Sequence, residues 1–188
     1  VVVGNSNNGG SNYDFALIRY NSNGNLDSTF DTDGKVTTAI GSSWDFCYSV
    51  AIQTNGKIVV AGYSSNGSNS DFALARYNSN GSLDNTFDGD GKLTTAFGSG
   101  DDVGHSVAIQ TDGKIIMAGS SSNGTNLDLA LVRYNIDGSL DNTFGSGGKV
   151  TTAIGSDIDY GYSVAIQSDG KILVAGSSSD GSDDDFAL

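Results

Sequence analysis

The sequence predicts an all-β protein built from tandem four-stranded antiparallel blades of a β-propeller, and three observations support this. The string DFAL or DLAL begins at Asp14, Asp71, Asp128 and Asp185, so that one repeat step is 57 residues. Every complete copy contains four short runs of β-prone residues, separated by segments rich in Gly, Asn and Ser. An Asn-Gly or Asp-Gly pair stands between the first two runs. Equal units of four short strands are typical of propeller blades.

Residues 49–105 illustrate one repeat in chain order. The first run, SVAIQ, is separated from the second, KIVVA, by Asn55-Gly56, and both residues of such a pair accept positive φ in a tight hairpin. A polar loop leads to the third run, DFALARY, and a longer polar connection leads to the fourth, KLTTAF. The repeat therefore predicts a four-stranded meander.

The third run favours a propeller over other repeat folds. Phe72 and Leu74 point to one face and Ala73 and Ala75 to the other, so both faces are apolar and we expect neighbouring blades to cover both. A β-solenoid is the main alternative, but its coils are usually much shorter than this repeat. Helical repeats do not fit the density of Gly and Asn or the absence of a 3.6-residue period.

The repeat also divides the chain. We predict a partial blade and connection in 1–48, blades in 49–105 and 106–162, and a partial blade in 163–188, all in one array. Propellers usually have about four to eight blades. We therefore expect further repeats of the same protein, or other copies of the chain, to complete the ring.

Two motifs resemble a known repeat family. LDNTFGSGGKVTT begins at Leu140 and SVAIQSDGKILVAG at Ser163, and the other copies match the first motif from Leu26 and Leu83. This pairing is similar to the delta-60 repeat family. The resemblance implies a propeller-like repeat domain of large bacterial secreted or surface proteins. It implies no defined enzymatic activity and no catalytic residues.

Composition and charge exclude several classes of function. The formal net charge is −13, and all 22 acidic residues are aspartate. The nine basic residues follow the repeat, one Arg and two Lys per copy, so there is no basic cluster of the kind that nucleic-acid binding needs. No run approaches the roughly 18 apolar residues of a membrane helix, and we predict no membrane insertion.

Candidates for catalysis are weak. His105 is the only histidine, and its repeat equivalents are Tyr48 and Tyr162, which favours a packing role for a planar side chain. The single cysteine, Cys47, corresponds to Gly104 and Gly161 and is interpreted as a tolerated small residue. One His and one Cys make a zinc site improbable. We therefore predict a non-enzymatic protein, with a glycan hydrolase or lyase as the alternative from another class.

The recurring charges predict structural pairs. One arginine per copy can form a bidentate ion pair with an aspartate at a fixed repeat position. The predicted partners precede SVAIQ, and Asp14, Asp71, Asp128 and Asp185 form a second recurring set. The residues assigned to the predicted pairs are Arg19, Arg76, Arg133, Asp45, Asp102 and Asp159.

Calcium is the sharpest cofactor hypothesis. The loops DTDG and DGDG carry Asp31, Asp33, Asp88 and Asp90, and oxygen-rich loops with a glycine turn suit a hard cation. The third copy, GSGG, loses both carboxylates but keeps the turn, so the shared task of the loop is the turn. We expect that no cofactor is required and leave calcium binding open.

The variable loops predict where a partner binds. Strand connectivity places residues 64–70, 98–105, 121–127 and 155–162 on one rim, and these loops differ most between copies. The predicted rim is acidic through Asp101, Asp102, Asp157 and Asp159, which suits a cationic or hydroxyl-rich partner such as a protein or glycan. We predict a structural or interaction segment of an extracellular or cell-surface bacterial protein. The alternative is a self-assembling fibre or sheath subunit.

Overall fold

The computed structural model describes residues 1–7 and 12–188, which form four antiparallel sheets. The two complete sheets hold β4 (Asp45–Ile52), β5 (Ile58–Ser65), β6 (Ser70–Tyr77) and β7 (Lys92–Thr95), then β8 (Asp102–Ile109), β9 (Ile115–Ser122), β10 (Leu127–Tyr134) and β11 (Lys149–Thr152). The flanking three-stranded sheets hold β1 (Val2–Asn7), β2 (Tyr13–Ile18) and β3 (Lys35–Thr38), then β12 (Asp159–Ile166), β13 (Ile172–Ser179) and β14 (Asp184–Ala187). The predicted all-β fold of repeated antiparallel blades is confirmed.

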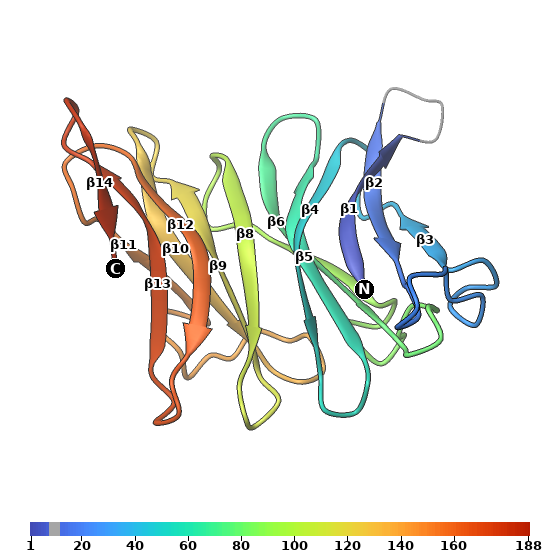
Figure 1. Ribbon diagram of the computed structural model, residues 1–188. Helices are drawn as coiled ribbons and strands as arrows, with labels where there is room; N and C mark the ends of the chain where they lie inside the picture. Colours follow the sequence, from blue (N-terminus) through green and yellow to red (C-terminus); the bar gives the residue numbers. More distant parts are fainter. Residues whose placement is uncertain (8–11) are drawn as a thin grey trace.

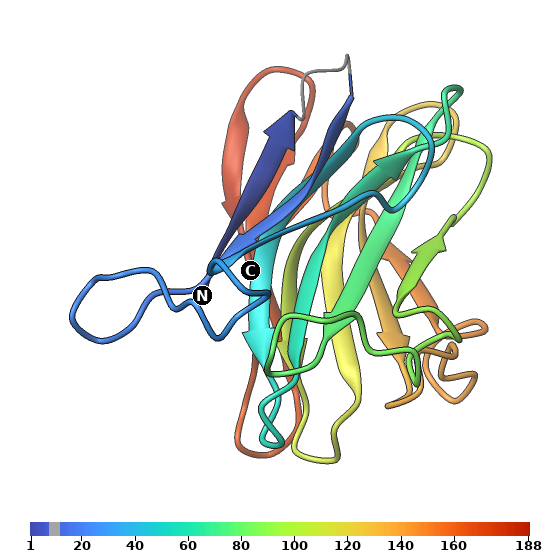
Figure 2. The ribbon, with the colours of Figure 1, turned by 90° about the vertical axis from the view of Figure 1, so that its right-hand side faces the viewer.

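The sheets stand side by side in chain order (Figure 1). The hairpins between first and second strands lie at one end, and the loops between second and third strands lie at the other. The view turned by 90° shows the sheets one behind another (Figure 2). Strand β4 contacts β8, and β8 contacts β12, so the first strands form the inner side of the stack.

The cores lie between the sheets, as the two apolar faces of the third run predict. Phe72 and Leu74 of β6 are buried against the third sheet, whereas Ala73 and Ala75 are buried against the first. Tyr77 also joins two blades, since its hydroxyl bonds to Thr38 Oγ1 over 2.7 Å. None of the described residues forms a helix of the length and apolarity that crossing a bilayer requires.

The hairpin turns form at the predicted positions, but only the glycines take positive φ. Gly56, Gly113 and Gly170 have φ of 80°, 84° and 85°, while the preceding Asn or Asp keeps negative φ. In the first of these turns, Gly56 N donates to Gln53 O over 2.9 Å. This is a hairpin loop in which a single glycine in the left-handed region closes the turn.

The strand that contains each SVAIQ run starts earlier than that run, at Asp45, Asp102 and Asp159. The predicted limits at 49, 106 and 163 therefore fall within β4, β8 and β12. Each strand extends upstream of SVAIQ through a β-bulge. The register shifts lie at Cys47/Ser49, Gly104/Ser106 and Gly161/Ser163. The extra residues in these bulges are Tyr48, His105 and Tyr162.

A glycine on the partner strand makes each bulge possible. A Cβ on Gly119 would lie 2.0 Å from the carbonyl oxygen of Val103, and one on Gly62 would lie 1.8 Å from that of Phe46. Bulges of this kind re-aim side chains and are frequent beside functional sites. Here they turn one planar side chain per blade onto the inner face of the stack.

Candidate functional site

The recurring arginines form ion pairs, but not with the predicted aspartates. Arg76 Nε donates to Asp84 Oδ2 over 2.6 Å, and the equivalent distances are 2.8 Å for Arg19–Asp27 and 2.7 Å for Arg133–Asp141. The predicted pairing with Asp45, Asp102 and Asp159 is therefore wrong. The chain folds back after the third strand through a bridge between Tyr77 and Leu83, which brings the aspartate eight residues onward against the arginine.

Two of the three arginines also contact the next repeat, since Arg19 Nη1 donates to the carbonyl oxygen of Ser79 and Arg76 makes the equivalent bond. The Arg76 guanidinium lies 4.6 Å from the centre of the Phe87 ring, and its Nη1 donates to the carbonyl oxygen of Ile136 in the next repeat. Lys57 Nζ reaches the same oxygen of Asp84 over 2.6 Å. Burial alone would raise the pKa of Asp84, but the hydrogen bonds from Lys57, Thr86 and Arg76 outweigh burial and hold that pKa below its usual value. The charges of Lys57, Arg76 and Asp84 therefore stabilise the fold.

The aspartates that begin the first strands close loops. Asp102 Oδ2 accepts from Phe97 N over 2.7 Å, and the equivalent bonds join Asp45 to Ile40 N and Asp159 to Ile154 N. All three aspartates are fully buried. The prediction that Asp102 and Asp159 belong to an exposed acidic rim is wrong, because their carboxylates satisfy backbone N–H groups inside the loops.

The other two predicted rim residues do lie at the rim. Asp101 is exposed, and its Oδ1 accepts from Ser70 N over 2.8 Å. The carbonyl oxygen of Asp157 accepts from Asn126 Nδ2 over 2.6 Å. Both bonds tie a blade-to-blade loop to a loop between second and third strands, so these loops share one rim as predicted.

Ring contacts run across the inner face next to this rim. The bulge residue His105 lies 5.5 Å from Tyr48 and 5.4 Å from Tyr162, measured between ring centres. Tyr48 and Tyr162 are about half exposed, at 48% and 51%. Further ring contacts extend the series in both directions. We call this series the aromatic row, and it consists of Tyr13, Phe46, Tyr63, Tyr48, His105, Tyr162 and Tyr160.

His105 is placed for packing. Burial between the tyrosines lowers the pKa of its imidazole, which therefore favours the neutral form. Within the described part of the chain its ring makes no hydrogen bond to a serine or aspartate. Burial likewise raises the pKa of the Cys47 thiol to about 12, so this buried thiol is a poor nucleophile.

A hollow of about 560 Å³ opens beside the aromatic row at the third blade. Its walls include Tyr63 from the second blade and Tyr160 from the fourth, with Val103, His105 and Ser120 between them. Asp101 and Asp157 border the same hollow. We call it the rim hollow. It is the place where side chains from three blades meet around one space.

Two small cross-strand neighbours open the rim hollow in the third blade. Val103 departs from Phe46 and Tyr160, whereas serine recurs at Ser6, Ser120 and Ser177 and Tyr63 is the exception. Val103 and Ser120 are cross-strand partners at the positions where the second blade has Phe46 and Tyr63. In the second blade those two rings stack at 5.2 Å and fill the space. In the third blade the two small side chains leave it open.

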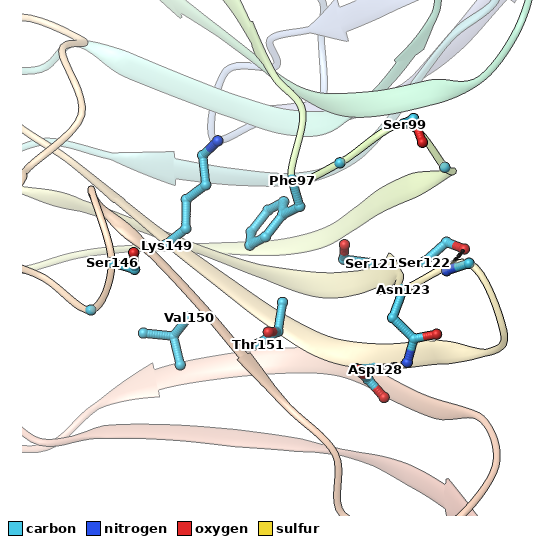
Figure 3. Close-up of a pocket in the computed structure, with 14 residues that line it drawn as sticks. Phe97, Ser99, Ser121, Ser122, Asn123, Asp128, Ser146, Lys149, Val150 and Thr151 are labelled. Carbon is cyan, nitrogen blue, oxygen red and sulfur yellow. Dashed lines mark hydrogen bonds between the residues drawn. The ribbon is translucent and has the colours of Figure 1, made fainter.

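A second and larger cavity, of about 740 Å³, lies on the outer side of the third blade (Figure 3). Much of its wall is glycine and serine, from residues 97–100, 121–124 and 145–146. Lys149 Nζ already donates to Ala96 O over 2.6 Å, and Asp128 accepts from Asn123 over 2.9 Å. Asp128 Oδ1 in this wall is buried without a hydrogen-bond partner among the described residues, and Asp128 and Lys149 are the charged residues of the lining.

The predicted calcium loops use one carboxylate each within the turn. Asp33 accepts from Lys35 N and Asp90 from Lys92 N, both over 2.9 Å. Asp31 and Asp88 have positive φ, of 45° and 49°. Within the described ranges, no group of three or more His, Cys, Asp or Glu side chains lies together as a metal site. Calcium binding stays a prediction.

The sequence of the chain matches a protein-family model. A family model described as a domain of unknown function (DUF5122) β-propeller matches residues 1–30, 53–87, 110–144 and 167–188. The chain belongs to this family. The match supports the expected propeller-like repeat family but does not carry the delta-60 name. A search of curated proteins finds no match.

The matched segments of this DUF5122 propeller contain the Arg–Asp pairs but not β4, β8 or β12. Tyr63 and Ser120 of the rim hollow lie inside the matches, whereas Asp101, Val103, His105, Asp157 and Tyr160 lie outside. The repeat pattern does not predict the hollow, because the pattern reports only residues that recur. The signal in the sequence is the set of positions at which one copy departs from the others, such as Asp101 and Val103.

Proposed function

We propose that this chain is a non-enzymatic interaction segment of a secreted or cell-surface bacterial protein, which binds its partner along the aromatic row and the rim hollow. The observation that carries the proposal is the half-exposed ring that a β-bulge turns onto the inner face in the second and fourth blades, at Tyr48 and Tyr162. Exposed aromatic side chains beside polar loops are typical of binding surfaces.

The distribution of polar groups supports binding rather than catalysis. The recurring Arg, Lys and Asp side chains are engaged in joints between and within blades. His105 packs between two tyrosines, without a serine or aspartate bound to its ring in the described chain. Placement outside the cell rests on the motif resemblance, and fractionation of cells that produce the native protein tests it.

The binding role is tested with immobilised polymers of different chemistry. The 188-residue chain is passed over poly-lysine and over dextran, beside a Tyr48→Ala/Tyr162→Ala variant of the same charge. We expect at least one polymer to retain the chain and the double variant to lose most of that retention. Retention of neither polymer, or equal retention of the variant, contradicts the role.

A further inference from the structure

The rim hollow carries an inference about ligand chemistry, which rests on the proposed binding function. Its first support is a buried polar atom without a partner. Ser120 is 0% exposed, lines the hollow, and its Oγ has no hydrogen-bond partner within residues 1–7 and 12–188. Burying a hydroxyl without a hydrogen bond destabilises the folded chain, because the group loses its hydrogen bonds to water. A ligand that bonds to this hydroxyl offsets that loss.

The charges around the hollow are of one sign. Asp101 and Asp157 are the charged residues among those that line it, and no Lys or Arg of the described chain is in the lining. The pKa of Asp71, nearby on β6, is raised by burial and then by the negative charges of Asp102 and Asp101. Asp101 and burial also act on Tyr63, whose pKa is raised to about 12 mainly by burial. The local field therefore favours a cation.

These two carboxylates are outside the repeated pattern. Asp101 corresponds to Trp44 and Ile158, and Asp157 corresponds to Gly100 and Ser43. Recurring aspartates are explained by the fold, because they cap loops or pair with arginine. Two non-recurring carboxylates from different repeats, beside the two small residues that open the space, point to a role in binding.

The walls of the rim hollow add aromatic rings to the carboxylates. Tyr63 and Tyr160 present aromatic rings from opposite blades, and an organic cation is attracted to such ring faces, most strongly where water is excluded. His105, which favours its neutral form, adds a third ring without adding positive charge. Rings, carboxylates and a hydrogen-bond acceptor in one space are the groups that an ammonium head on an alkyl chain needs.

We propose that the rim hollow binds an alkylammonium group, of the kind that a free amine or a lysine side chain presents. The alkyl chain packs against Val103 and the tyrosine rings. The ammonium N–H groups donate to Ser120 Oγ and to the carboxylates of Asp101 and Asp157. A hollow of about 560 Å³ is large enough for a short alkyl chain and its charged head.

The test is calorimetric titration of the 188-residue chain with n-butylammonium and with 1-butanol, which has the same alkyl chain without the charge. We expect the cation to bind with a Kd of about 1 mM, a weak affinity in keeping with one small charged group, and the alcohol to bind at least about tenfold more weakly. A capped tripeptide with a central lysine distinguishes a protein source from a free amine. Equal binding of cation and alcohol, or no binding of either cation or peptide, overturns the proposal.

Variants locate the site. Ser120→Tyr introduces the residue that the second blade has at Tyr63 and should fill the hollow, and Asp101→Asn removes one carboxylate. We expect each to weaken cation binding by about tenfold. The control is Asp112→Asn, which removes the same charge at the other end of the third blade and matches Asn55 of the second blade. Equal weakening by the control contradicts the site.

The outcome separates this inference from the proposed function. If the polymers are still retained in a manner that depends on Tyr48 and Tyr162, but n-butylammonium does not bind, only the ligand chemistry is wrong. If neither result is obtained, the binding function itself fails.

Discussion

Val103 and Ser120 are direct neighbours across β8 and β9, at the positions where Phe46 and Tyr63 stack in the preceding blade. The same sheet geometry therefore carries a filled face in one repeat and an open one in the next. The backbone needs no change for this, because the bulge and the glycine opposite it recur in both blades. Val103 replaces the aromatic ring that Phe46 and Tyr160 supply in the flanking blades, whereas Ser120 keeps the serine that recurs at Ser6 and Ser177.

The bulge in β8 should depend on Gly119. We expect Gly119→Ala to lower the free energy of unfolding by about 1–3 kcal/mol or more, the usual range for overpacking, because its Cβ would lie 2.0 Å from the carbonyl oxygen of Val103. Denaturant unfolding measures the change. Gly98→Ala is the control, since nothing lies within 4 Å of its Cβ position, and an equal loss in both variants contradicts this explanation.

The ion pair of Asp84 should matter far more than an exposed pair. Arg76 and Asp84 have side chains only 2% and 4% exposed. Removing the carboxylate by Asp84→Ala leaves a buried charge without its partner and should cost about 3–5 kcal/mol. Asp169→Ala breaks the Lys171–Asp169 pair, which is largely exposed, and should cost at most about 1 kcal/mol. Similar melting temperatures for the two variants would show that the buried Arg76–Asp84 pair stabilises the fold no more than the exposed Lys171–Asp169 pair.

His105 should make stability depend on pH. Burial lowers its pKa in the folded chain below the usual histidine value of 6.5, so the unfolded chain takes up a proton first as the pH falls. Stability should therefore decrease as the pH falls from 6.5 toward the lowered folded pKa. In His105→Tyr, which carries the residue of the neighbouring copies, this part of the decrease should vanish. The aspartates titrate in both proteins, so parallel stability curves would show that His105 contributes nothing.

Calcium should not be needed for folding. The carboxylates of Asp33 and Asp90 accept backbone N–H groups within their turns and have their main role there. We expect the melting temperature to stay the same after addition of a chelator and after addition of millimolar calcium. A rise with calcium that is absent in an Asp31→Asn/Asp88→Asn variant would instead establish the site predicted from the sequence.

Much of the fold follows from sequence periodicity. The repeat, the four runs, the hairpin positions and the two apolar faces of β6 are all local or periodic features, and the structure has them where they were predicted. The shared rim follows from strand connectivity alone. These features depend on hydrophobic pattern and turn chemistry, which are read directly from residue types.

The charge partners could not be assigned in the same way. Several recurring aspartates are possible partners of Arg76 in the sequence. The chain folds back after β6 through the bridge between Tyr77 and Leu83, and this path places Asp84 against Arg76. The burial of Asp102 depends on the loop that wraps its carboxylate. Both outcomes require the three-dimensional path of a connection, which no periodic pattern reports.

The methyl resonances of Val103 test most directly whether the rim hollow binds a ligand. Val103 lines the hollow, whereas Val36 is buried between the first and second blades and serves as the internal control. In a titration with n-butylammonium we predict a saturable shift of the Val103 methyl signals while those of Val36 stay in place. Unmoved Val103 signals, or equal shifts at both residues without saturation, would contradict the account.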